Sequence, residues 1–82
     1  MQWNTQTHQR MVTLVERVVP EPFRDTALDG LQTDAETSAQ QRSSTEVEDQ
    51  DLIQAIESAP SFIQDELYNT LSQMGVAVER AL

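Results

Sequence analysis

The chain contains no cysteine and no lysine, and it has one histidine and two glycines among its 82 residues. Without cysteine it forms no disulfide, no thiolate zinc site and no iron–sulfur cluster. One histidine is too few for a histidine-rich metal site, and two glycines are too few for a glycine-rich phosphate loop. We therefore expect no catalytic residues and no metal site, and we place an enzyme last among the function classes.

Basic residues are also scarce, since five arginines face 14 Asp and Glu, a formal net charge of −9. Nucleic acids and anionic lipids are bound by clustered Lys and Arg, so neither is an expected partner. The charge is uneven along the chain. Residues 1–42 hold four Arg and six acids, a net of −2, whereas residues 43–82 hold one Arg and eight acids, a net of −7. Such a surface would be steered toward a basic docking surface on a partner.

Long apolar runs are missing too, and none approaches the roughly 18 residues that suggest a membrane span. The N-terminus lacks the basic and apolar regions of a signal peptide. These features favour a cytoplasmic location, with any membrane association made through a protein partner. The hydrophobic content of 38% is below the globular average, so the core is expected to be small and a partner is a plausible extra stabiliser.

Apolar residues at spacings of three and four predict four helices. They cover residues 4–19, 22–40, 45–59 and 61–74. Asn4 or Thr5 is the expected first N-cap, and Thr45 with Glu48 fits a capping box for the third helix. Prolines at 20, 22 and 60 interrupt the helices, and Gly75 suits the position after the last one. The tail 76–82 reads as a strand-like arm or a short turn.

The fold class is therefore all-α, with two helical hairpins joined by a polar linker. We divide the chain into a first hairpin at 1–40, a flexible linker at 41–45 and a second, acidic hairpin with a short tail at 46–82. An offset of 40 places Pro20 on Pro60 and Leu31 on Leu71, which fits either a repeat or two unrelated hairpins with proline turns. The hairpins either pack as a small four-helix domain or dock separately on a partner. Gly30, inside the second helix, suggests close packing there.

Three features could carry chemistry. The acids from Glu46 to Asp51 begin a calcium-loop pattern but lack its glycine, so we interpret them as acids favoured by a helix N-terminus. His8 borders the first apolar stripe, and it is either a rim residue or an axial ligand to the metal of a tetrapyrrole. Trp3 is either a staple on the first helix or a partner contact.

The stretch from Val19 to Val47, together with an early Trp3, resembles the C-terminal domain of the B subunit of light-independent protochlorophyllide reductase. The matching positions are Trp3, Val19, Pro20, Arg24, Ala27, Leu31, Ala35, Thr45, Glu46 and Val47. The basic residues and tyrosine of the family's second helix are replaced here by Asp29, Asp34 and Glu36, and residues 60–82 are not covered. The resemblance implies a helical docking element in a photosynthetic or chlorophyll-biosynthesis assembly, at the cytoplasmic face of a photosynthetic membrane. It does not carry over the reductase chemistry, because this chain lacks cysteine and a phosphate loop.

The leading hypothesis is a small non-enzymatic protein that docks on a larger complex as an accessory subunit or assembly factor. Its expected partner-binding residues are Trp3, Phe23, Arg24, Phe62, Ile63 and Tyr68. One alternative is a tetrapyrrole-binding protein that uses His8; otherwise we expect no cofactor. Another alternative is an acidic regulator of a nucleic-acid-binding machine, which would bind a protein subunit and not the nucleic acid itself.

Overall fold

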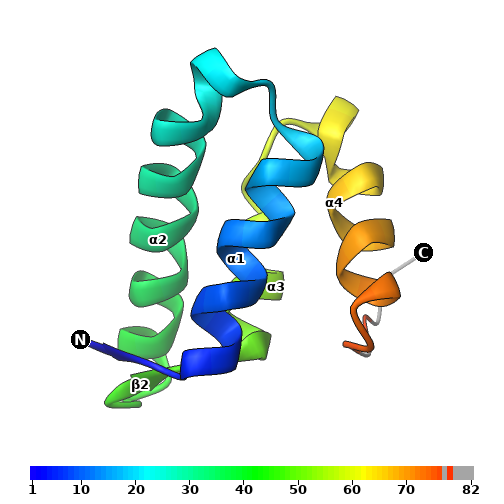
Figure 1. Ribbon diagram of the computed structural model, residues 1–82. Coiled ribbons are helices and arrows are strands. Elements are labelled where there is room, and N and C mark those ends of the chain that lie inside the picture. The colour runs from blue at the N-terminus through cyan, green and yellow to red at the C-terminus, as the bar shows by residue number, and fades with distance from the viewer. Residues whose placement is uncertain (77, 79–82) are drawn as a thin grey trace.

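The computed structural model describes residues 1–76 and 78, and α-helices dominate them (Figure 1). The helices are α1 (Thr5–Val18), α2 (Arg24–Gln41), α3 (Asp49–Glu57) and α4 (Ser61–Gln73), with a short 3-10 turn, η1 (Glu21–Phe23), before α2. Two-residue strands β1 (Gln2–Trp3) and β2 (Glu46–Val47) pair in parallel. The all-α prediction with four helices is confirmed, and the small strand pair is an addition that helical periodicity does not reveal.

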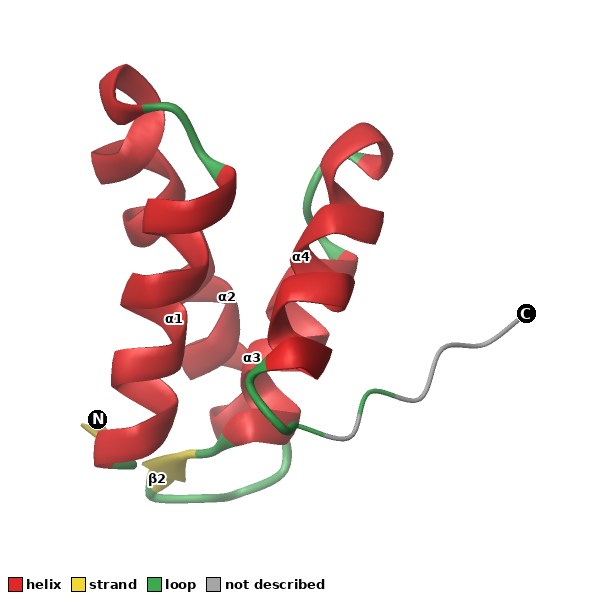
Figure 2. Cartoon of the chain, turned by 45° about the vertical axis from the view of Figure 1, so that its right-hand side comes forward, coloured by secondary structure: helices red, strands yellow, loops and turns green. Residues whose placement is uncertain are grey.

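Successive helices run in opposite directions, so the α1–α2 and α3–α4 connections lie at the same end of the molecule, the upper end in Figure 1. Both connections contain the prolines of the sequence, and we call this the proline end. The strands β1 and β2 and the start of α3 lie at the opposite end, the strand end, which is also visible in the turned view of Figure 2. The alternating topology thus brings together turns that are about 40 residues apart in the chain.

One hydrophobic core joins the two hairpins. It contains Met11, Leu14 and Val15 of α1, Leu31, Ala35 and Ala39 of α2, Leu52, Ala55 and Ile56 of α3, Leu67, Tyr68 and Leu71 of α4, and Val47 and Val76. Helix α2 packs most extensively on α3, where fully buried alanines let the backbones approach. Of the two arrangements that the sequence leaves open, the structure shows the packed four-helix domain.

Helix ends follow from local chemistry. The Asn4 side chain accepts hydrogen bonds from the amides of Gln6 (3.0 Å) and Thr7 (3.2 Å), so of the two candidates Asn4, and not Thr5, is the N-cap of α1. Pro20 ends α1, since residues before a proline avoid helical geometry. Gly75 has φ +88°, a left-handed conformation that glycine tolerates best, which confirms it as the residue that terminates α4.

The predicted start of the third helix is wrong. Residues 46–47 are extended, with Gln2 opposite Glu46 and Trp3 opposite Val47, so α3 begins only at Asp49. The capping box is formed by Glu48 and Asp51 in place of Thr45 and Glu48. Strand pairing prevents residues 45–48 from forming a helical turn, and this depends on a contact with the other end of the first hairpin. Helix α2 also extends through Gln41, which leaves residues 42–45 as the connection between the hairpins.

The expectation of close packing at Gly30 is also wrong. A Cβ atom at this position would meet nothing within 4 Å, so close packing does not explain the glycine. Gly30 is exposed to solvent, and its backbone is part of the regular helix α2. The predictions for the tail 76–82 fall largely outside the described residues; within them, Val76 is buried and Val78 packs partly on the core.

Candidate functional site

Apolar side chains from both hairpins meet at the proline end around a surface groove of about 350 Å³. Its lining residues are Val18, Val19, Pro20, Phe23, Phe62 and Ile63, and we call it the groove. Phe23 is 64% exposed and Phe62 is 83% exposed. Three of the six residues expected from the sequence to bind a partner (Phe23, Phe62 and Ile63) therefore line one surface, although they come from opposite halves of the chain.

The groove adjoins a smaller apolar cavity of about 150 Å³, which we call the recess. Val19 and Ile63 line both cavities. The other residues that line the recess are Ala27, Gly30, Leu31, Ala59, Pro60 and Leu67. Leu31 and Leu67 belong to the core, so the recess leads from the surface down to the packed interior.

Local structure explains why the two phenylalanines are exposed. Phe23 is the last residue of η1, and Phe62 is the second residue of α4, directly after Pro60 and Ser61. The proline turns hold both residues outside the four-helix core. Full burial of a phenylalanine side chain stabilises a fold by about 1.5–3 kcal/mol, and these two exposed side chains lack most of that stabilisation. Neighbouring exposed aromatics of this kind mark interaction surfaces more often than isolated apolar residues do.

Acidic residues dominate the chain around the groove. Segments 16–25 and 57–66 contain six acids, Glu16, Glu21, Asp25, Glu57, Asp65 and Glu66, and two arginines, Arg17 and Arg24. Their net charge is therefore −4. Asp65 and Glu66 follow Phe62 by three and four positions on α4, which places them on the same side of that helix.

Arg24, another expected partner-binding residue, has a structural role. Its Nε donates to the carbonyl oxygen of Val19 (3.0 Å), and Nη2 donates to that of Glu16 (2.9 Å). These carbonyls lie at the C-terminal end of α1, where a cation is favoured by the helix dipole. Arg24 thereby fixes the angle between α1 and η1, which supports Phe23 in the groove wall.

The remaining sequence-derived candidates lie elsewhere. Tyr68 is only 7% exposed and belongs to the core, so it does not contribute to the groove surface. Trp3 lies at the strand end, where its Nε1 donates to Glu36 Oε2 at 2.9 Å. His8 is exposed on α1 and its ring meets that of Trp3 edge-on, with centroids 5.8 Å apart. Trp3 is therefore hydrogen-bonded to α2, and His8 lies against its ring. Both residues lie at the strand end, away from the groove.

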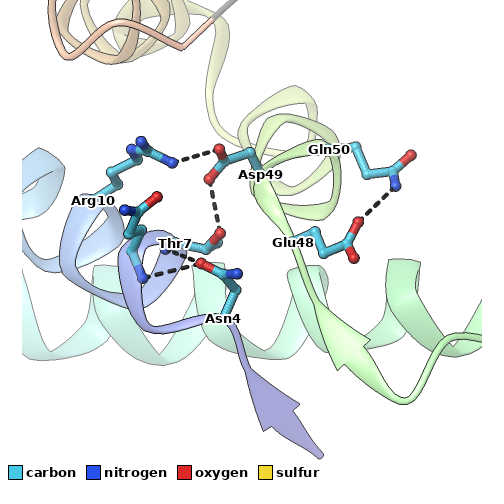
Figure 3. Close-up of a pocket in the computed structure, with 7 residues that line it drawn as sticks. Asn4, Thr7, Arg10, Glu48, Asp49 and Gln50 are labelled. Atoms are coloured by element: carbon cyan, nitrogen blue, oxygen red, sulfur yellow. Dashed lines mark hydrogen bonds and ion pairs between the residues drawn. The ribbon is translucent and has the colours of Figure 1, made fainter.

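A polar pocket at the strand end lies between the N-termini of α1 and α3 (Figure 3). Asp49 accepts a hydrogen bond from the Thr7 hydroxyl (2.7 Å) and pairs with Arg10 (2.5 Å). Gln50 donates to Glu48 across the other side of the pocket (3.2 Å), as Figure 3 shows. These side chains satisfy one another, so the pocket is better explained as a junction between helices than as a ligand site.

Asp51 forms the second polar junction, and its side chain is fully buried. Arg42 binds it with two hydrogen bonds, Nε to Oδ1 (2.9 Å) and Nη2 to Oδ2 (2.7 Å). The Ser38 hydroxyl and the Glu48 amide each donate at 2.9 Å. Burial by itself raises the pKa of Asp51, but these donors and the arginine charge outweigh it, so the pKa is lowered. The helix dipole accounts for an acid at position 51 but does not predict this network, whose only local signal is the position of Asp51 three residues after Glu48.

Within residues 1–76 and 78, no group of three or more His, Asp or Glu side chains is arranged to hold a metal ion. None of the helices in the same part of the chain is both long and apolar enough to span a bilayer. No protein-family model, curated protein or solved structure matches the chain.

Proposed function

We propose that the protein is a non-enzymatic docking module that binds a partner protein through the groove at the proline end. The observation that carries this proposal is the pair of exposed phenylalanines, Phe23 and Phe62, beside a cavity with an apolar lining. Aromatic residues in apolar surface pockets supply much of the energy of protein–protein association. At the strand end, in contrast, Asp49 and Asp51 already bind polar side chains of the chain itself.

The charge around the groove selects the kind of partner. A net charge of −4 on the two flanking segments favours a surface that combines apolar anchors with Lys or Arg. Such charges raise the association rate and exclude acidic partners, while the buried apolar contacts supply most of the affinity. We therefore assign to the partner a basic surface with protruding apolar side chains.

Site-specific photo-crosslinking in cells of the source organism tests this function. A photoreactive amino acid replaces Phe62 in one variant and Thr37 in another, which is exposed on α2 outside the groove. We expect the first variant to give a defined adduct whose crosslinked segment on the partner contains both apolar and basic residues. The Thr37 variant should not give that adduct.

A second pair of variants excludes unfolding as the explanation. Phe23→Ser, combined with the photoreactive residue at position 62, should abolish the adduct, whereas Glu36→Gln at the strand end should leave it. Circular dichroism melts of both variants should stay close to that of the unsubstituted chain. Adducts that form equally from positions 37 and 62, or that survive Phe23→Ser unchanged, would refute docking through the groove.

The resemblance to the protochlorophyllide reductase domain supports a narrower form of the proposal, in which the partner belongs to a chlorophyll-biosynthesis or photosynthetic assembly. Its motif residues have structural contacts here: Trp3 lies opposite Val47 in the strand pair, and Arg24 caps α1. The identity of the adduct formed from position 62 decides this narrower proposal. A partner from an unrelated assembly would overturn it and leave the docking function in place.

A further inference from the structure

The recess has a glycine in its wall that the fold itself does not require. Gly30 lies in the interior of α2, where glycine is unfavourable compared with alanine. Its φ is not in the left-handed region, and a Cβ atom would meet nothing within 4 Å. Neither backbone conformation nor close packing therefore explains it. The consequence of glycine at this position is that one wall of the recess carries no side chain.

The size and lining of the recess match a single apolar side chain. Its volume is about 150 Å³, and every residue that lines it is apolar. Apolar cavities of roughly this size hold a benzene-sized group. Since Val19 and Ile63 line both cavities, a side chain that enters the recess belongs to a segment that also contacts the groove.

The charge of the chain decides between possible occupants. A second copy would bring another net charge of −9 against the acidic flanks of the groove, and an anionic lipid surface would be repelled in the same way. A basic segment is attracted to both flanks. An amphipathic helix with Lys or Arg on its polar face presents apolar residues three and four positions apart, which suits a deep recess beside a wider groove.

We propose that the recess is a specificity pocket for one large aliphatic or aromatic side chain of a basic amphipathic helix, and that Gly30 sets its size. This inference rests on the proposed docking function, because the recess is reached from the same surface as the groove. It adds the secondary structure of the partner segment and a residue that determines which side chain is accepted. In this assignment, Phe23 and Phe62 provide affinity and Gly30 provides selectivity.

To test this proposal, the full chain is titrated with a helical peptide of Leu and Lys that has its leucines at helical spacing. Binding is measured by calorimetry and by changes in the amide chemical shifts of the chain. A scrambled peptide of the same composition controls for attraction by charge alone. We expect the helical peptide to shift amides of α2 and α4 around the recess and to bind more tightly than the scrambled one. Gly30→Leu should weaken binding about tenfold or more, because its side chain occupies the space of the peptide leucine.

Gly30→Ala is the matched control, since it adds only a methyl group to the same helix position. It should bind the peptide nearly as well as the unsubstituted chain, and circular dichroism should show both variants folded. Replacing each peptide leucine by alanine in turn adds a second measurement. One replacement should weaken binding to the unsubstituted chain but have little further effect on the Gly30→Leu variant.

Equal affinity of the unsubstituted chain and the Gly30→Leu variant would overturn the pocket assignment. The docking function would survive that result if Phe62→Ser still weakened peptide binding. Binding of the scrambled peptide as tight as that of the helical one would overturn the basic-helix occupant, and so would an absence of binding. In those two cases the crosslinking from position 62 still decides independently whether the groove docks a protein.

Discussion

The strand end and the proline end of the molecule differ in how their side chains are satisfied. At the strand end, Asp49 and Asp51 accept hydrogen bonds from Thr7, Arg10, Ser38 and Arg42, and no buried side-chain polar atom of the described residues lacks a partner. At the proline end, Phe23 and Phe62 project into solvent beside two apolar cavities. The strand end thus stabilises the fold, and under the proposed function the proline end binds the partner.

The largest expected effect is at the buried carboxylate. Asp51→Asn removes the charge that pairs with Arg42 and leaves the donors around it partly unsatisfied, so it should lower the free energy of unfolding by about 2–4 kcal/mol. Urea titration followed by circular dichroism measures this. Asp49→Asn is the comparison variant: its partially exposed pair with Arg10 should contribute about 1 kcal/mol or less. Equal losses in the two variants would contradict the ranking of the two junctions.

Acidic pH should destabilise the fold by protonating Asp51. The pKa of Asp51 is lower in the folded chain than in the unfolded one, so its contribution is fully present above the unfolded pKa, near 4. That contribution is lost as the pH falls through the folded pKa. We expect the free energy of unfolding to drop steeply below about pH 4, and Asp51→Asn to show a shallower drop. Parallel pH profiles for the two proteins would remove Asp51 as the cause.

An intermediate effect is expected at the first helix cap. Asn4→Ala removes the acceptor for two amides of α1 and should destabilise the fold by about 1 kcal/mol, whereas Asn4→Ser should restore most of the loss. The midpoint of urea unfolding measures both variants. A loss that serine does not rescue would indicate that Asn4 acts through the polar pocket and not as a cap.

The smallest effect on stability is expected at the proline end. Phe62→Ser should change the free energy of unfolding by less than about 0.5 kcal/mol, because the side chain is mostly exposed. In the calorimetric titration, the same variant should bind the helical peptide more weakly than the unsubstituted chain does. A loss of stability comparable to that of Asp51→Asn would mean that Phe62 belongs to the fold, and the contrast between the two ends would then fail.

The sequence predicts much of this fold because most of it is local. Apolar spacing identifies the four helices, and Asn4, Pro20 and Gly75 mark their ends by chemistry that depends on near neighbours. The start of α3 could not be predicted in this way, since it depends on the pairing of Val47 with Trp3 across 44 positions. The Asp51 network likewise depends on side chains from α2 and on the connection that follows it.

The candidate site was predicted in part. Phe23, Phe62 and Ile63 were among the residues expected to bind a partner, and they line the groove, but the sequence does not show that they share one surface. An offset of 40 residues superimposes Pro20 on Pro60. Because successive helices alternate in direction, two turns at this offset lie at the same end of the molecule, which brings these residues together. Tyr68 could not be separated from these residues by composition, because its burial is decided by the packing of α4 on the core.

The position of Trp3 has a practical consequence for experiments. It is the single tryptophan of the chain, and it lies at the strand end with its indole nitrogen bonded to Glu36. Its fluorescence therefore reports on the strand end directly and on the proline end only through global unfolding. If fluorescence and circular dichroism give the same unfolding curve, the two ends unfold as one cooperative unit. If the fluorescence changes first, the strand end opens before the helices do.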